Sequence, residues 1–95
     1  MYLIKETKSF RISYKKLKVS GLSGAVLEDI KNVIKILSLG KNLPKDYKDH
    51  ELTGDLRGYR DCHIKGDLLL VYTKKEDKLI LILLDIGSHS KIFRH

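Results

Sequence analysis

Three histidines and one aspartate in the second half of the chain are the residues best suited to move protons near neutral pH. They are His50, His63, Asp67 and His89. An unperturbed imidazole has a pKa of about 6.5, so one ring can accept a proton while another donates one. RNA cleavage needs both steps, because the 2′-hydroxyl loses a proton as it attacks the phosphate and the 5′-oxygen gains one as it leaves. Each positioned proton transfer is typically worth about 10²–10⁴ in rate.

The second half of the chain is expected to form a small antiparallel sheet. Residues 59–64 alternate polar and apolar side chains, and apolar runs of strand length follow at 68–72 and 79–84. Polar turns at 65–67 and 74–77 join these segments. The pattern predicts a three-stranded meander.

Alternation along the first of these strands decides which side chains share a face. Successive residues of a strand point to opposite faces, so Cys62 and Ile64 are expected to face the core, and Asp61 and His63 to face away from it. The other three candidates lie on the polar loop before this strand, in the turn after it, and just past the last strand. The two strand-associated histidines, His63 and His89, can therefore reach one concavity on the open face of the sheet.

The first half of the chain predicts a short strand at residues 2–6 and then two helices. In the first helix, Phe10, Tyr14 and Leu17 follow at helical spacing from Lys8 onward. The second begins near residues 22–23 and ends before Gly40. The order of elements predicts one α+β domain, residues 1–95, with a helical hairpin packed on one face of a small antiparallel sheet and the other face partly open.

The charge balance favours a polyanionic partner. Nineteen Lys and Arg residues against twelve Asp and Glu residues give a net charge of +7. Such an excess attracts nucleic acid, an anionic membrane or an acidic protein. The longest apolar run, residues 79–84, is too short to span a bilayer, and no signal peptide is apparent. A lone Cys62 permits no internal disulfide, so we expect a cytoplasmic protein without membrane attachment.

The same residues allow three other interpretations. A zinc site built from His50, Cys62, His63 and His89 has suitable ligand types, but adjacent strand residues such as Cys62 and His63 cannot aim at one ion. The same argument excludes Cys62 as a nucleophile, since a core cysteine behaves as a small hydrophobe. Taken from the pattern alone, three scattered histidines can also be unrelated surface residues.

Four ordered blocks of sequence carry a resemblance to a known family. They are residues 43–54 (LPKDYKDHELTG), residues 58–64 (GYRDCHI), residues 67–72 (DLLLVY), and residues 87–90 (GSHS) followed by Phe93. In this order and spacing the blocks resemble the YafQ-like branch of the RelE toxin family. The resemblance implies helices on one face of a small antiparallel sheet, and cleavage of mRNA in the ribosomal A site. It also implies inhibition by a cognate antitoxin, which can bring the complex to operator DNA.

The resemblance also implies roles for individual residues. The family's catalytic positions fall on His50, His63, Asp67 and His89, with His89 moving protons at the scissile phosphate. Phe93 would pack against an mRNA base or support His89. No cofactor or metal ion is expected to take part.

One position departs from the family pattern. Many relatives carry arginine two residues before the glycine of the GSHS block, where this chain has Asp85. An anion there repels the phosphate in the transition state. Three nearby cations are candidates to compensate and to bind substrate: Arg60, Lys91 and Arg94. The alternative function is a catalytically weakened homologue that binds its antitoxin or operator DNA.

Overall fold

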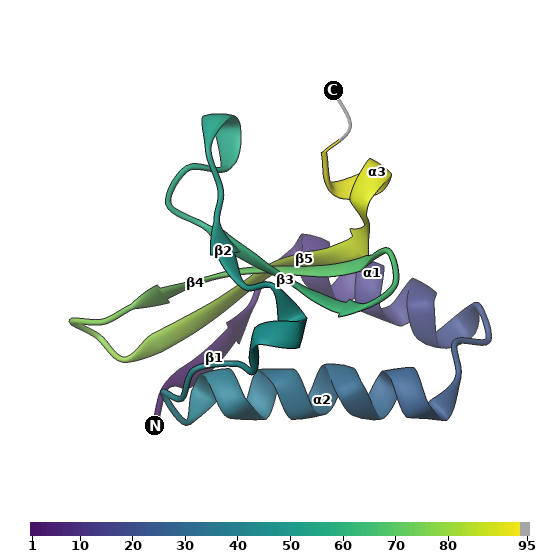
Figure 1. Cartoon of the computed structure of the whole chain (residues 1–95), viewed down its shortest axis with the longest axis horizontal. Helices are drawn as coiled ribbons and strands as arrows, with labels where there is room; N and C mark the ends of the chain where they lie inside the picture. The colour runs from purple at the N-terminus through teal and green to yellow at the C-terminus, as the bar shows by residue number, and fades with distance from the viewer. Residues whose placement is uncertain (94–95) are drawn as a thin grey trace.

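A mixed sheet of five strands forms the centre of the computed structural model, which describes residues 1–93 (Figure 1). Along the chain the elements are β1 (Leu3–Glu6), α1 (Lys8–Val19), α2 (Gly24–Ser38), β2 (His50–Glu51), β3 (Arg60–Lys65), β4 (Leu68–Lys75), β5 (Ile80–Ser88) and α3 (His89–Ile92). Two turns of 3₁₀ helix, η1 (Lys45–Tyr47) and η2 (Gly54–Leu56), flank β2. The predicted α+β class is confirmed. Arg94, one of the predicted substrate-binding residues, lies outside the described residues.

The strand order in the sheet is β1-β5-β4-β3-β2. Strands β3, β4 and β5 form the predicted antiparallel meander, and β5 continues beyond its expected end to Ser88. The predicted opening strand, β1, pairs in parallel with β5, which makes the sheet mixed rather than purely antiparallel. Residues 50–51, expected to be loop, pair with β3 as β2.

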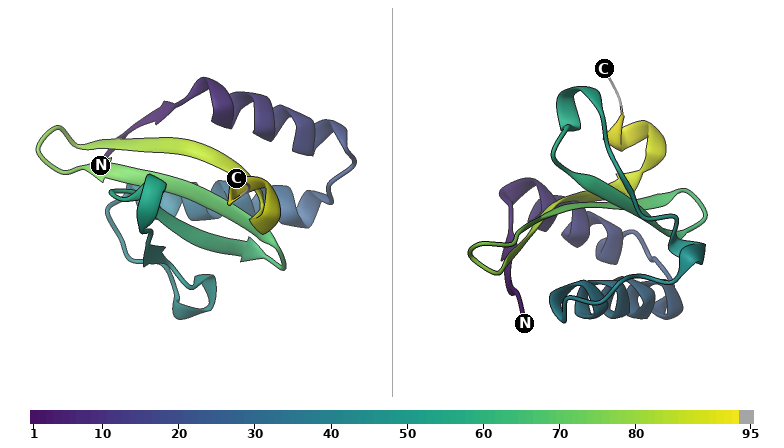
Figure 2. Two further views of the ribbon diagram at one scale, coloured as in Figure 1. Left: turned by 90° about the horizontal axis from the view of Figure 1, so that it is seen from above. Right: turned by 60° about the vertical axis from the view of Figure 1, so that its left-hand side comes forward.

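Helices α1 and α2 lie on one side of the sheet, as predicted, while α3 and η2 lie on the other (Figure 2). Thr7 and Ser23 begin the two long helices, because each hydroxyl accepts a hydrogen bond from the N–H three residues on. Gly40, with a φ of 76°, follows the end of α2. The core between helices and sheet consists of Phe10, Ile30, Val33, Leu37, Cys62, Ile64, Leu70, Tyr72, Leu81, Leu83 and Ile86.

A β-bulge in β5 changes which side chains reach the open face. Tyr72 pairs with Leu83, but its neighbour Val71 pairs with Asp85, so Leu84 is an extra residue in β5. Because Leu83 lies in the core, the bulge turns Asp85 to the opposite face. Bulges commonly redirect a side chain in this way beside a functional site. Among residues 1–93, no helix combines the length and the apolar character needed to cross a bilayer.

Candidate active site

The open face of the sheet carries a row of side chains contributed by four strands. Backbone pairing aligns His50 with Asp61, and Asp61 in turn with Val71. Val71, in β4, also pairs with Asp85 in the neighbouring strand β5. Paired residues on neighbouring strands project to the same face, and His63, two residues beyond Asp61, projects there as well. The prediction that Asp61 and His63 face away from the core is confirmed.

Asp61 lies within this row and is almost fully buried, with 1% of its surface exposed. Its Oδ1 atom has no hydrogen-bond partner among the described residues, although Nδ1 of His50 lies 3.1 Å away. Burial raises the pKa of the Asp61 carboxyl, and the nearby His50, His63 and His89 oppose that rise. Of the three, His50 opposes the rise most and His89 least.

The orientation of His50 follows from the turn that precedes it. Lys48 has a φ of 49°, a left-handed conformation that a residue with a side chain adopts at a cost of about 1–2 kcal/mol. Its carbonyl oxygen lies 2.8 Å from Nδ1 of His50. A carbonyl oxygen can only accept, so Nδ1 carries the proton. The other ring nitrogen, Nε2, is then the one that can exchange a proton with a substrate.

His89 is placed by contacts at the end of β5. Its backbone N–H donates to the carbonyl oxygen of Asp67 at 3.1 Å and to the Oδ1 atom of Asp67 at 3.2 Å. Ser88 caps the short helix α3, because its hydroxyl accepts from the N–H of Lys91. The rings of His89 and Phe93 pack with their centroids 4.7 Å apart. Asp67 and Phe93, two of the predicted site residues, thus meet at His89.

Three of the side chains on the open face can also hold a metal ion. Ligand atoms of His50, Asp61 and His63 all lie within 4.8 Å of one another. This set differs from the zinc set considered in the sequence analysis, which included Cys62. The thiol of Cys62 lies in the core, where burial raises its pKa to about 12, so it is neither a thiolate ligand nor a nucleophile at neutral pH.

Two of the predicted substrate-binding cations, Arg60 and Lys91, lie among the described residues, and each contacts an acidic side chain. Arg60 projects to the core side of β3, where its Nε atom lies 3.3 Å from Oδ1 of Asp49 and its guanidinium is also paired with Glu51. It borders a cavity of about 540 Å³ on that side. The Nζ atom of Lys91 lies 3.1 Å from Oδ1 of Asp85. Both cations are therefore already engaged with acidic side chains.

Asp61 belongs to this site, although the sequence pattern did not predict it as a site residue. Alternation placed it on the correct face, but a charged side chain in a strand is ordinarily exposed. Its burial depends on the pairing of His50 in β2 with Asp61 in β3, and the loop that contains β2 has no periodic pattern. The usable signal was the alternation itself, which put a carboxylate and an imidazole two residues apart on one face.

Comparison with known proteins places this site in a family. The family model described as the bacterial toxin of type II toxin-antitoxin system, YafQ, matches residues 2–94. The mRNA interferase toxin YafQ of Escherichia coli K12 is 47% identical over 51 residues, which cover 54% of this chain and 53% of that protein. The matched segment thus spans about half the length of that relative.

Solved structures match nearly the whole chain. A metal-bound toxin from Helicobacter pylori has a TM-score of 0.87 and 39% identity, covering 98% of this chain and 100% of that one. The corresponding chain of the Escherichia coli DinJ-YafQ complex has a TM-score of 0.83 and 26% identity, covering 98% of this chain and 99% of that one. With a family model that matches residues 2–94, this chain belongs to the YafQ family of toxins from bacterial type II toxin–antitoxin systems.

Proposed function

We propose that this chain is the toxin of a toxin–antitoxin pair and that it cleaves mRNA in the ribosomal A site. The observation that carries the proposal is the cluster of His50, Asp61 and His63 on the open face, with the exposed His89 held at the end of β5 by Asp67. The proposal is supported by the name of the Escherichia coli relative, an mRNA interferase. Such a toxin acts in the cytoplasm, where its ribosomes are.

In the proposed reaction the histidines transfer protons, and neighbouring groups hold the imidazole rings in position. One imidazole accepts the 2′-hydroxyl proton as the oxygen attacks the phosphate, and another donates a proton to the 5′-oxygen as it leaves. His89 is the exposed imidazole proposed to work at the scissile phosphate. Asp67 holds its backbone N–H, and Phe93 packs on its ring. The carbonyl oxygen of Lys48 holds the ring of His50, and Oδ1 of Asp61 lies 3.1 Å from the same nitrogen.

A divalent metal ion is a proposed inhibitor at the same cluster. Two imidazoles and a carboxylate suit zinc or copper, and the Helicobacter pylori relative is described as metal-bound. An ion held by His50, Asp61 and His63 would occupy nitrogens that must otherwise exchange protons. Micromolar Zn²⁺ should therefore slow cleavage, and EDTA should restore it. A rate that rises with added Zn²⁺ would contradict this role.

The partner we propose is an acidic antitoxin that covers the basic, open face. The net charge of +7 favours such a partner, and the DinJ-YafQ complex is a precedent in the family. The toxin–antitoxin complex is proposed to reach operator DNA through the antitoxin. Co-expression with the protein encoded in the adjacent reading frame, followed by purification of a stable complex, tests this pairing.

The proposed activity is tested with purified ribosomes and a short mRNA. The wild-type chain should cut the mRNA on ribosomes but not the same mRNA alone, and its expression without antitoxin should arrest growth. His89→Ala should relieve the arrest, because it removes the proposed proton donor or acceptor. Lys78→Met, in the turn between β4 and β5, is the matched control and should remain toxic. If the wild-type chain cuts no mRNA and leaves growth unchanged, the weakened, antitoxin-binding alternative suggested by Asp85 is favoured.

A further inference from the structure

We propose that Lys91 is a positioning residue, which forms an ion pair with Asp85 that anchors α3 and so places His89, instead of contacting the mRNA phosphate. The inference rests on the proposed function for its effect on cleavage. It gives a structural purpose to an acidic residue at the position where the family pattern has arginine.

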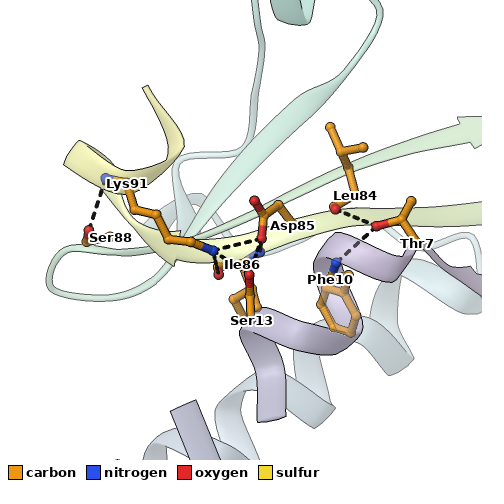
Figure 3. Close-up of polar contacts among 8 residues, drawn as sticks. All are labelled: Thr7, Phe10, Ser13, Leu84, Asp85, Ile86, Ser88 and Lys91. Atoms are coloured by element: carbon orange, nitrogen blue, oxygen red, sulfur yellow. Dashed lines mark hydrogen bonds and ion pairs between the residues drawn. The ribbon is translucent and has the colours of Figure 1, made fainter. Parts of the chain in front are cut away.

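All three hydrogens of the Lys91 ammonium have acceptors within the protein (Figure 3). The Nζ atom lies 3.1 Å from Oδ1 of Asp85 and 3.4 Å from the carbonyl oxygen of Ile86. It also donates to the hydroxyl oxygen of Ser13. A lysine ammonium has three N–H groups, so this arrangement directs none of them at a phosphate.

The carboxylate of Asp85 likewise has three hydrogen-bond partners within the protein. Its Oδ1 atom accepts from the Ser13 hydroxyl at 2.6 Å and from the backbone N–H of Ile86 at 2.8 Å, in addition to Lys91. Its side chain is 26% exposed and that of Lys91 is 40% exposed, so solvent screens the ion pair in part, and the shared hydrogen bonds rather than charge alone hold the contact. Because Lys91 balances its charge locally, Asp85 repels an approaching phosphate less than an isolated carboxylate would.

The contact joins three elements that are far apart in the sequence. Ser13 belongs to α1, Asp85 follows the bulge in β5, and Lys91 lies in α3. Helix α3 has only four residues, too few to be stable without tertiary contacts. Lys91 lies two residues after His89 and two before Phe93. Fixing Lys91 therefore fixes the single turn that carries both rings.

Gly87 provides the space that the Lys91 side chain crosses. A Cβ atom at this position would lie 2.7 Å from Cδ of Lys91, closer than van der Waals contact allows. Gly87→Ala should therefore displace the lysine stem while leaving both charges of the ion pair in the chain. It is a test of the geometry that does not remove Lys91 or Asp85.

The experiment compares Asp85→Asn, Lys91→Met, the double variant and Gly87→Ala in the ribosome cleavage assay. Lys78→Met is the control for loss of a positive charge. A displacement of about 1 Å in a reacting group can cost about 10² in rate, so we expect each single variant to lower kcat by about 10-fold or more with KM changed less than about 2-fold. The double variant should be no slower than the worse single one, because both remove the same contact.

The opposite role for Lys91 makes opposite predictions. If its ammonium bound the phosphate, Asp85→Asn would release it and raise the rate, and Lys91→Met would mainly raise KM. That pattern would overturn the proposal. So would a double variant whose loss is the product of the two single losses.

A measurement without substrate separates this inference from the proposed function. The backbone N–H of Phe93 donates to the carbonyl oxygen of His89, and its hydrogen-exchange rate reports the closing of α3. We expect Lys91→Met and Gly87→Ala each to speed that exchange by about 10-fold or more, with unchanged exchange in β4 as evidence that the fold is intact. Unchanged exchange at Phe93 in both folded variants would overturn the anchoring role, whether or not the wild-type chain cleaves mRNA.

Discussion

The Nδ1 atom of His50 lies 3.1 Å from Oδ1 of Asp61, an ion-pair distance between a half-exposed imidazole and a carboxyl with 2% of its side chain exposed. The same nitrogen lies 2.8 Å from the carbonyl oxygen of Lys48. The carbonyl oxygen of Lys48 therefore orients the ring, and the Asp61 carboxylate lies close enough to attract it when the imidazole is protonated. Holding a carboxylate in this buried position works against stability, because burial disfavours its charged form.

Asp61→Asn should separate stability from activity. Burial raises the pKa of Asp61 in the folded state, so the folded chain holds this proton more tightly than the unfolded chain. Its stabilising contribution is then present below the unfolded pKa of about 3.9 and is lost as pH rises through the folded pKa. The difference in free energy of unfolding between Asp61→Asn and wild type should therefore shift in favour of the variant as pH is raised from 4 to 7.

The same variant should cleave mRNA more slowly. Without the carboxylate, the ring of His50 loses the negative charge that lies 3.1 Å from its Nδ1 atom, and we expect kcat to fall by about 10-fold or more, a part of the ~10²–10⁴ that positioned proton transfer contributes. Denaturant unfolding at several pH values and the ribosome assay measure the two effects. A variant that is less stable than wild type by the same amount at every pH would contradict a raised pKa for the buried Asp61 carboxyl.

Phe93→Ala should affect catalysis more than folding. The ring of Phe93 packs against His89 with centroids 4.7 Å apart, and aromatic pairs of this kind are worth about 0.5–1.5 kcal/mol. Since α3 lies at the periphery of the core, the melting temperature should change little. Cleavage should fall by about 10-fold, with Phe93→Leu as the control that keeps apolar volume. Equal rates for the alanine variant and wild type would show that His89 needs no support from this ring.

The helices and the central strands could be predicted because their signals are local. Helical spacing marked α1 and α2, and apolar runs marked β4 and β5. The pairing of β1 with β5 could not be predicted in this way, because it depends on contacts such as Leu3 with Ile80, which are remote in sequence. The same holds for β2, which is two residues long and exists as a strand only through its partners in β3.

In the candidate site, too, the features set by local sequence could be predicted and those set by remote contacts could not. Period-two alternation correctly assigned His63 to the open face, because the face of a strand residue is a local property. The partners of Lys91 and Asp85 were not predictable, since Ser13 reaches them from a helix more than 70 positions away. The bulge that turns Asp85 outward likewise shows only in the pairing of β5 with β4.

Cys62 should be unreactive in the folded chain. Burial raises the pKa of its thiol to about 12, and its surface is fully covered. A thiol reagent at pH 8 should therefore label the native chain at least about 10²-fold more slowly than the chain unfolded in guanidinium, because only the thiolate reacts. Cys62→Ala should keep its ribosome-dependent cleavage. Loss of cleavage in an alanine variant that remains folded would contradict this prediction and would support Cys62 as a catalytic nucleophile.

Tyr72 and Tyr2 offer a matched pair for measuring the network on the core side of the sheet. The buried Tyr72 hydroxyl donates to Oδ1 of Asp49 at 2.7 Å, whereas the Tyr2 hydroxyl donates to Glu76 in a solvent-exposed contact. Tyr72→Phe should lower the free energy of unfolding by about 1–3 kcal/mol, because it leaves a part-buried acceptor with one fewer donor. Tyr2→Phe should cause no measurable change.

The contribution of Tyr72 should also depend on pH. Burial, followed by the bond to Asp49, raises the pKa of the Tyr72 hydroxyl. The unfolded chain therefore loses this proton first, and the stability difference between wild type and Tyr72→Phe should be constant below pH 9 and shrink above the unfolded pKa of about 10. Because Tyr72 and Asp49 lie on the face opposite the histidines, kcat should stay within about 2-fold of wild type at a temperature where both are folded. A large loss of kcat would mean that the two faces of the sheet are coupled through β3, where Arg60 and Asp61 are neighbours.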